Sequence, residues 1–461
     1  MLTLGLARTE ITPEESVPLF GYGDRTHNST GVHDPLFAYA WYLRTEGGRS
    51  FVWIILDVCL FSIKTASDLK RMIAARTGLS SDDILLQATH THSGPDTSTL
   101  TDSEEPWAKR YTELLVERLQ AAVTEAKASS FQGTIEVRKG TLGIGTNRRG
   151  TELPIDPQLV VLSLVDEAKK VRGVLFYHSC HLTALGVDNY LISADWVGSV
   201  RSRFESKQKI PFAFIQGAEG NIDPRTRGVL DMADPDQAKG ISFSEMEKLS
   251  DEAAEALKKA CASVPVAILD DFRIVSFSTE LPLKFGPLTD ADARKKIDRW
   301  KVSFAEFLGI SPEDVPEGEI INALIKERCR ELSLPAAEVL HWVAEQFAYT
   351  SFLMLSCKPG ENVDVRRGCA EVPVTIVDFG KLFFACVPAE VLIENVFDLQ
   401  KRFEAKIALI AGLSNGWLGY FPHGSNFHEK AASELYETVS TLFSEKAAGV
   451  FLDAVEKAVK G

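Results

Sequence analysis

The sequence predicts an α/β protein with mixed β-sheets flanked by helices and with an inserted helical subdomain. Short apolar runs bounded by turn residues alternate with longer amphipathic stretches, which is typical of α/β architecture. One connection looks like a hairpin around residues 378–380, in "VDFGKLF", so the sheets should be mixed rather than purely parallel. At 461 residues one or two domains are possible, and we expect a single domain over residues 1–461.

The predicted strands are rich in Val, Ile, Leu and Phe and end at polar or turn residues. In chain order they are "RSFVWIILDVCLF", "DILLQATHTH", "QLVVLSLVD", "VRGVLFYHS", "PFAFIQG", "VPVTIVDFG", "KLFFACVP" and "KIALIAGLS". Helical periodicity between them predicts helices over residues 107–128, 195–206, 244–261 and 390–403.

Residues 289–352 differ from the rest of the chain in composition. They are rich in Lys, Glu, Arg, Ala and Leu and hold no good strand, which predicts a helical segment inserted between two sheet strands. Such an insertion either covers a site as a lid or only packs on the outside of the domain. The sequence leaves both readings open.

Composition and charge exclude several classes of function. The net charge of −14 and the lack of a basic block argue against binding to nucleic acid or to an anionic membrane. No apolar run reaches the roughly 20 residues of a membrane span, so no transmembrane segment is expected. The N-terminus lacks a signal-peptide pattern, which predicts a cytoplasmic location, or secretion if a leader was removed. The oligomeric state is not predicted.

The seven cysteines are scattered and form no CxxC pair. They predict neither a disulfide framework nor a thiolate zinc site, and we expect reduced, mostly buried side chains. They are Cys59, Cys180, Cys261, Cys329, Cys357, Cys369 and Cys386.

Two histidines end the predicted strand in "LLQATHTHSGP". Residues two apart in a strand point to the same face, so His90 and His92 can address one point in space. The alternative is a pair of hydrogen-bonded polar residues at a strand end, and the spacing alone favours that alternative.

Other predicted strand ends carry further candidate ligands. His178 and His181 follow one strand, and Glu390 lies in the first turn of the helix predicted after another. Strand ends are where α/β sheets gather functional groups, and His with carboxylate ligands suits Zn²⁺ with one position open for water. His178 could instead be a core histidine, and Glu390 could complement the helix dipole.

Two more strand ends open into loops with special residues. "IQGAEGNIDP" holds Gly217 and Gly220, which allow close approach of backbone to a ligand, and then Asp223 before a proline. "GLSNGWLGYFP" holds Tyr420, whose hydroxyl could bind substrate or metal. A plain turn and ordinary packing are the alternatives.

Taken in order, seven segments resemble the catalytic N-terminal domain of the neutral/alkaline (non-lysosomal) ceramidase family. Together they extend over nearly the whole chain. They are "GYGDRTHNSTGVHDPLFAYAWYL", "LLQATHTHSGP", "GTNRRG", "CHLTALGVDNYLISADWVG", "IQGAEGNIDP", "VPAEVL" and "NGWLGYFP" with the later "LYE".

The resemblance implies a zinc cofactor and roles for eight residues. It favours His181 over His178 as a ligand, and it leaves Arg149 as an alternative to Arg148. His92 would face the scissile bond and handle a proton, and Asp223 occupies a catalytic turn. The implied ligands of Zn²⁺ are His90, His181, Glu390 and Tyr420, and the implied catalytic or substrate-contacting residues are His92, Asp223, Arg148 and Tyr436.

The function implied by the resemblance is hydrolysis of a linear amide bond in an N-acyl or ceramide-like substrate by a zinc-bound hydroxide. Two alternatives stay open. One is a metal-dependent hydrolase or isomerase of a small polar sugar or ester, and the other is a non-catalytic metal-binding relative. The chain also departs from the family's pattern: Asp223 stands where the family's turn has a serine, so the resemblance is to a divergent member of the family. That carboxylate could act as a general base, bind a cationic substrate group or recruit a second cation.

Overall fold

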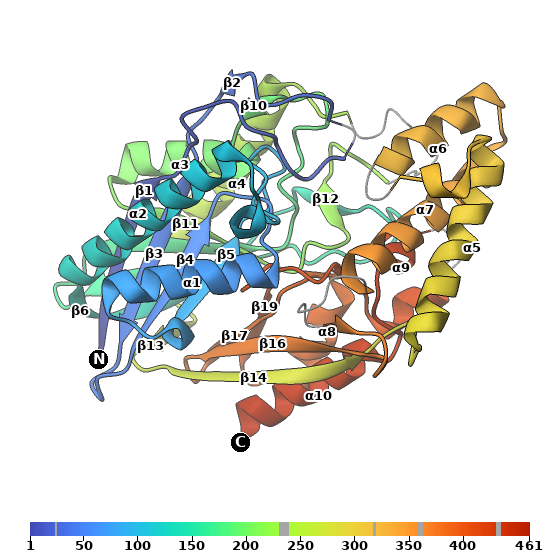
Figure 1. Cartoon of the computed structure of the whole chain (residues 1–461). Coiled ribbons are helices and arrows are strands. Elements are labelled where there is room, and N and C mark those ends of the chain that lie inside the picture. The colour runs from blue at the N-terminus through green and yellow to red at the C-terminus, as the bar shows by residue number, and fades with distance from the viewer. Residues whose placement is uncertain (24, 230–238, 317–319, 357–362, 430–434) are drawn as a thin grey trace.

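A nine-stranded sheet and a five-stranded sheet form the centre of the molecule, with helices on their outer faces (Figure 1). The computed structural model describes residues 1–461 except 24, 230–238, 317–319, 357–362 and 430–434. Both sheets contain parallel and antiparallel pairs. The prediction of an α/β fold with mixed sheets is therefore confirmed.

The large sheet carries most of the N-terminal half of the chain. Its outer strand pairs, β9 with β11 and β4 with β5, are parallel, and the strands between them are antiparallel. The strand order is β11 (Phe212–Gln216), β9 (Val171–His178), β8 (Gln158–Asp166), β6 (Phe131–Thr141), β1 (Leu2–Glu10), β3 (Phe37–Arg44), β4 (Ser50–Leu56) and β5 (Ile84–Ala88), and β13 (Ala267–Leu269) pairs with β6.

The small sheet contains the predicted hairpin. β16 and β17 pair antiparallel around the turn at residues 379–381, where Gly380 has a φ of 79° that favours glycine. β17 and β19 are parallel, joined by a crossover that includes α8 (Glu394–Arg402). The order is β14 (Arg273–Pro282), β16 (Cys369–Asp378), β17 (Leu382–Cys386) and β19 (Ile407–Ala411), and β15 (Val363–Asp364) pairs with β16.

The two sheets pack face to face through large aromatic side chains. The ring of Trp53 meets Phe384 edge-on at 5.1 Å between centroids, and Trp41 stacks on Phe379 at 5.9 Å. Helices cover the outer faces. α1 (Ile63–Thr77), α2 (Pro106–Ala128), α3 (Asp195–Gln208) and α4 (Phe243–Ala262) pack on the large sheet, and α8 and α10 (Ala447–Lys460) pack on the small one.

The segment predicted as an insertion is helical. α5 (Asp290–Leu308), α6 (Ile320–Glu331) and α7 (Ala336–Ser356) form a separate group at one side of the molecule (Figure 1). This group leaves the sheet after β14 and returns before β15 and β16, and β14 and β16 are themselves antiparallel neighbours. α7 packs on α9 (Tyr436–Ser440), which begins within the last quoted motif, "LYE".

Short strand pairs occupy the loops that follow the sheet strands. β7 (Gly145–Asn147) pairs with β12 (Ile222–Pro224), and β18 (Glu390–Val391) pairs with β20 (Tyr420–Phe421). The remaining elements are β2 (Gly31–Val32), β10 (Leu191–Ile192) and the 3₁₀ turns η1 (Ser81–Asp83), η2 (Leu100–Asp102), η3 (Pro312–Asp314) and η4 (Gly424–His428).

Three predictions about local structure meet different outcomes. The helix expected over residues 390–403 is wrong at its start, because α8 begins only at Glu394. The six cysteines within the described ranges are free, as expected, and Cys357 lies outside those ranges. Among the described helices, none combines the length and the apolar character that crossing a membrane requires.

Candidate metal centre

Three predicted ligands from distant parts of the chain converge in the buried interior. His90 follows β5, His181 follows β9 and Glu390 follows β17, and their ligand atoms all lie within 4.8 Å of one another. The Nε2 atoms of His90 and His181 are each 3.3 Å from Oε2 of Glu390. All three side chains are buried.

The far side of each imidazole is held by backbone carbonyl groups. His90 Nδ1 lies 2.9 Å from the carbonyl oxygen of Cys59, and His181 Nδ1 lies 2.8 Å from that of Glu219. A proton on each Nδ1 satisfies these carbonyls and turns the Nε2 lone pairs toward Glu390. Carbonyl-anchored imidazoles with one carboxylate are a donor set that fits zinc.

A second donor group overlaps this one. Cys59, His90 and His92 also bring ligand atoms within 4.8 Å of one another, with Cys59 Sγ 3.5 Å from His90 Nδ1. Cys59 Sγ lies on the Nδ1 side of His90, and that nitrogen also faces the Cys59 carbonyl oxygen. The Nε2 atom of His90 faces Glu390 instead, which favours the group that contains Glu390.

The histidine pair reaches the site by a route that the sequence argument did not foresee. β5 ends at Ala88, and His90 has a φ of 73°, so His90 and His92 do not share one face of a strand. Backbone bonds to Leu56 and Val58 hold the turn instead. The two rings still meet edge-on at 4.7 Å, so both do address one point in space.

His92 is a neutral imidazole at the edge of the centre. Burial and the neighbouring His90 and His181 rings hold its pKa well below the ordinary value. Its Nε2 is 3.3 Å from His90 Nε2, and its Nδ1 has no hydrogen-bond partner among the described residues. The ring is enclosed by the loop at Gly21, where a Cβ atom would lie 2.3 Å from His92 Cγ, and by the Tyr22 ring.

Glu390 and Tyr420 are direct partners across the short β18–β20 pair. Glu390 is not in a helix, so the helix-dipole alternative is wrong. Trp417 Nε1 donates to Glu390 Oε1 at 2.8 Å, which leaves Oε2 for the imidazoles. Burial would raise the pKa of Glu390, but His90 and His181 lower it well below its ordinary value, so Glu390 supplies an anionic oxygen.

Tyr420 keeps its phenolic proton in this environment. Burial, together with Glu390 and Tyr436, raises its pKa well above the ordinary value, while Arg148 lowers it. The Arg148 guanidinium lies 5.3 Å from the centre of the Tyr420 ring and 5.7 Å from that of Tyr436. The structure thus places Tyr420 beside Glu390, with Arg148 and Tyr436 around its ring.

The adjacent residues Arg148 and Arg149 have different partners in the structure. Arg148 donates to Glu437 through Nε at 2.7 Å and to the Gly220 carbonyl through a terminal nitrogen at 2.7 Å, and it lies 3.5 Å from Asp223. Arg149 points elsewhere and pairs with Glu429 and Glu437. Only Arg148 therefore borders the candidate centre.

Asp223 lies behind His181, on the side opposite Glu390. Its Oδ1 is 3.4 Å from His181 Nδ1, and Thr183 Oγ1 donates to it at 3.3 Å. Burial would raise the pKa of Asp223, but Arg148, His181 and Arg227 lower it below its ordinary value. The carboxylate is ionised and has two arginines to match its charge.

The helical insertion reaches this site through an aromatic contact. Phe347 on α7 meets the Tyr436 ring edge-on at 4.7 Å, and Tyr436 in turn meets Tyr420 at 5.1 Å. Phe347 and Tyr436 are both half-buried. The insertion is thus part of the wall beside the predicted ligand Tyr420.

The other histidines considered from sequence lie apart. His178 is a core histidine, which was the alternative to a role as ligand. Burial lowers its pKa to about 4, and its Nδ1 lies 3.0 Å from the Gln158 carbonyl oxygen. His33, in the first of the motifs that resemble the family, is exposed, pairs with Asp34 and stacks on Phe243.

Sequence reasoning missed several residues that hold the site together. Trp417, Glu219 and Glu437 each lie next to or within a quoted motif, which was the only signal for them.

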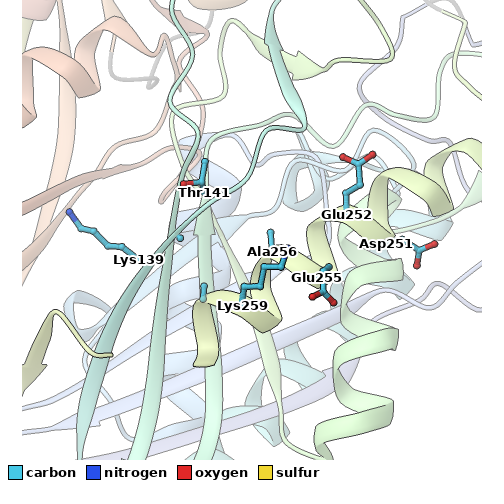
Figure 2. A pocket seen from close by; sticks show the side chains of 9 residues that line it. Lys139, Thr141, Asp251, Glu252, Glu255, Ala256 and Lys259 are labelled. Atoms are coloured by element: carbon cyan, nitrogen blue, oxygen red, sulfur yellow. The ribbon is translucent and has the colours of Figure 1, made fainter. Parts of the chain in front are cut away.

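A surface cavity of about 690 Å³ lies elsewhere, between the end of β6 and α4 (Figure 2). Charged side chains such as Lys139 and Glu255 line it, and none of the predicted site residues does.

Comparison with known proteins gives one family. The model of the family described as "Neutral/alkaline non-lysosomal ceramidase, N-terminal" matches residues 2–242. The chain is 26% identical over 325 residues to the neutral ceramidase of Pseudomonas aeruginosa, a match that covers 63% of this chain and 47% of that protein. It is 20% identical over 536 residues to the Drosophila melanogaster neutral ceramidase, covering 99% of this chain and 74% of that protein.

The fold has also been seen in a crystal structure. The chain superimposes on the neutral ceramidase from Pseudomonas aeruginosa with a TM-score of 0.70 and 18% sequence identity. The superposition covers 99% of this chain and 74% of the other. At this level of identity the likeness establishes a shared fold.

Proposed function

The chain belongs to the neutral/alkaline non-lysosomal ceramidase family, and from this premise we propose that it is a zinc-dependent hydrolase of a linear amide bond in an N-acyl, lipid-like substrate. The observation that carries the proposal is the convergence of His90, His181 and Glu390 with both Nε2 atoms facing one carboxylate oxygen. Those three residues, with Tyr420 beside them, would hold the zinc ion.

When bound, zinc would supply a Lewis acid that acidifies water and polarises the scissile carbonyl. The chain's own groups have distinct tasks. Neutral His92 accepts a proton at Nε2 from the attacking water and passes it to the leaving amine. The protonated Tyr420 hydroxyl donates to the oxygen on which charge develops, and Arg148 keeps the Tyr420 ring in place.

The test of this function is removal and return of the metal. Protein treated with a chelator should lose release of fatty acid from an N-acyl substrate such as ceramide, and one equivalent of Zn²⁺ should restore it. Circular dichroism should show that the chelated chain stays folded. Full hydrolysis by protein whose metal content has been shown to be far below one ion per chain would contradict the proposal.

In the alternative function, with a small polar substrate, Asp223 would act as the acid or base. The position of Asp223 argues against that role. Its carboxylate contacts Nδ1 of His181 rather than the Nε2 side, and its pKa is low. Arg148 and Arg227 already match its charge, which leaves no need for a cationic substrate group or a second cation at this place. We infer that Asp223 positions His181 and Arg148.

The cytoplasmic location stays a prediction.

The Asp223→Ser variant should hydrolyse N-acyl substrate about 10- to 100-fold more slowly than the wild type, which is the usual cost of losing a group that orients a ligand. It should keep its zinc, because the three converging ligands are intact. The measurements are kcat/KM and metal content. Faster cleavage of ceramide by the variant would instead show that this turn selects the substrate.

A further inference from the structure

A cluster of buried polar side chains lies beneath the metal centre, where the two edge strands of the large sheet meet. We define this seam cluster as Gln87 on β5, Gln216 on β11 and Glu219 in the loop after β11. All three residues are completely buried. None of them belongs to the groups assigned above to zinc binding or catalysis.

The two amide groups of the seam cluster have fixed orientations. Gln87 Nε2 donates to the carbonyl oxygens of Gln216 and Gly412, both at 2.9 Å, so it ties β5 to β11. Gln216 Nε2 donates to the Cys180 carbonyl at 3.1 Å. Because each nitrogen faces carbonyl oxygens, the Oε1 atoms are assigned without ambiguity.

Four oxygen atoms of the seam cluster lack a hydrogen-bond donor among the described residues. They are Oε1 of Gln87, Oε1 of Gln216 and both carboxyl oxygens of Glu219. Gln216 lies near enough to lower the pKa of Glu219, yet its nitrogen forms no well-shaped bond to the carboxyl group. Buried acceptors in native proteins are almost always satisfied, so this group requires a partner.

Backbone oxygens lie close to Glu219 Oε2. Glu219 Oε2, the Gly217 carbonyl oxygen and the Ala389 carbonyl oxygen lie 3.0, 3.0 and 3.1 Å from the position that a Cβ atom would occupy on Gly412. Glycine at position 412, which has no Cβ atom, therefore lets oxygens from two chain segments, residues 217–219 and the loop at Ala389, come close together. Carboxylate, amide and carbonyl oxygens together are ligands for a hard cation.

Neither oxygen of the Glu219 carboxyl group has a cationic hydrogen-bond donor among the described residues. A proton on Glu219 would supply one donor for several acceptors, and a water molecule would supply two donors and no charge. A cation satisfies all the oxygens and the charge together, and a single carboxylate beside a zinc centre favours a cation of one charge.

We propose that the seam cluster binds a monovalent alkali cation, Na⁺ or K⁺, between the edge strands of the large sheet. The bound ion joins β5, β11 and the loop after β17, which contains Ala389. It also fixes the backbone of Glu219, whose carbonyl oxygen anchors His181 Nδ1 at 2.8 Å. Its effect is on the stability of the scaffold under the metal centre.

The test compares the melting temperature in sodium, potassium and choline chloride at one fixed ionic strength, with zinc content held at one ion per chain. Sodium or potassium should raise Tm saturably by at least about 1 °C relative to choline. The Glu219→Gln variant, which keeps the shape and loses the charge, should show the same Tm in all three salts and should keep its zinc. Soaking crystals with Tl⁺ should give an anomalous peak beside Glu219.

Glu394→Gln is the matched control. Glu394 is also a mostly enclosed carboxylate near the site, but Asn221 Nδ2 donates to both of its oxygens at 3.2 and 3.1 Å. This variant should keep the wild-type response to cations. Equal Tm of the wild type in all three salts, or an unchanged cation response in Glu219→Gln, would overturn the proposal. Neither measurement involves catalysis.

Discussion

Replacing His181 with alanine should strip the metal from the protein and reduce amide hydrolysis by more than about 100-fold, beyond the usual cost of losing a group that only orients a ligand. His181 supplies one of the two Nε2 atoms that face Glu390 Oε2 at 3.3 Å. Without it one imidazole and one carboxylate remain from the converging set, too few for a closely held zinc ion. Metal content and kcat on an N-acyl substrate are the two measurements.

His178→Ala is the matched control, three residues away on the same segment. His178 is equally buried, but it contacts the Gln158 carbonyl and lies apart from the other ligands. This variant should lose some stability from the cavity that the truncation leaves. It should still bind one zinc ion. Loss of zinc from His178→Ala with retention in His181→Ala would reverse the assignment.

The strand ends could be predicted because they combine two signals. An apolar run followed at once by histidine or by a turn with carboxylates marks both the end of a buried strand and a candidate site. His90, Glu390 and Tyr420 were candidates on this ground, as were both His178 and His181, and the resemblance to a family chose His181 and added Arg148. The structure brings His90, His181, Glu390, Tyr420 and Arg148 together.

The geometry within the site could not be predicted, because it depends on tertiary contacts. The positive φ of His90 follows from backbone bonds to Leu56 and Val58, and no local pattern signals it. The strand at Glu390 exists only because Tyr420 pairs with it. The motif "GTNRRG" could not decide between Arg148 and Arg149, since the choice depends on where the distant Glu437 and Asp223 lie.

Several strands were missed for a related reason. β6 and β14 alternate buried and exposed residues and carry many polar side chains, so the search for continuous apolar runs passed over them. β1 and β3 were also missed, although they lie at the centre of the large sheet. The order of the strands needs pairing information that the sequence alone does not contain.

Glu437→Ala should lower the free energy of unfolding by about 3–5 kcal/mol, the typical cost of removing one partner from a buried ion pair. Glu437 is 1% exposed and accepts from Arg148 Nε and from a terminal nitrogen of Arg149, both at 2.7 Å. The substitution leaves two buried guanidinium groups without their shared carboxylate. Urea denaturation measures the loss.

Glu429→Ala separates this effect from a general loss of charge. Among the described residues Glu429 forms an ion pair only with Arg149, at 2.8 Å, and it also accepts from Asn426 Nδ2 at 2.7 Å. Its side chain is 20% exposed against 1% for Glu437. Water can replace part of that interaction, so the loss should stay near the cost of a partly exposed pair, about 1 kcal/mol. A similar small loss in Glu437→Ala would mean that Asp223 and Glu429 alone can hold the two arginines. In that case Arg148 would owe its place beside Tyr420 to Asp223.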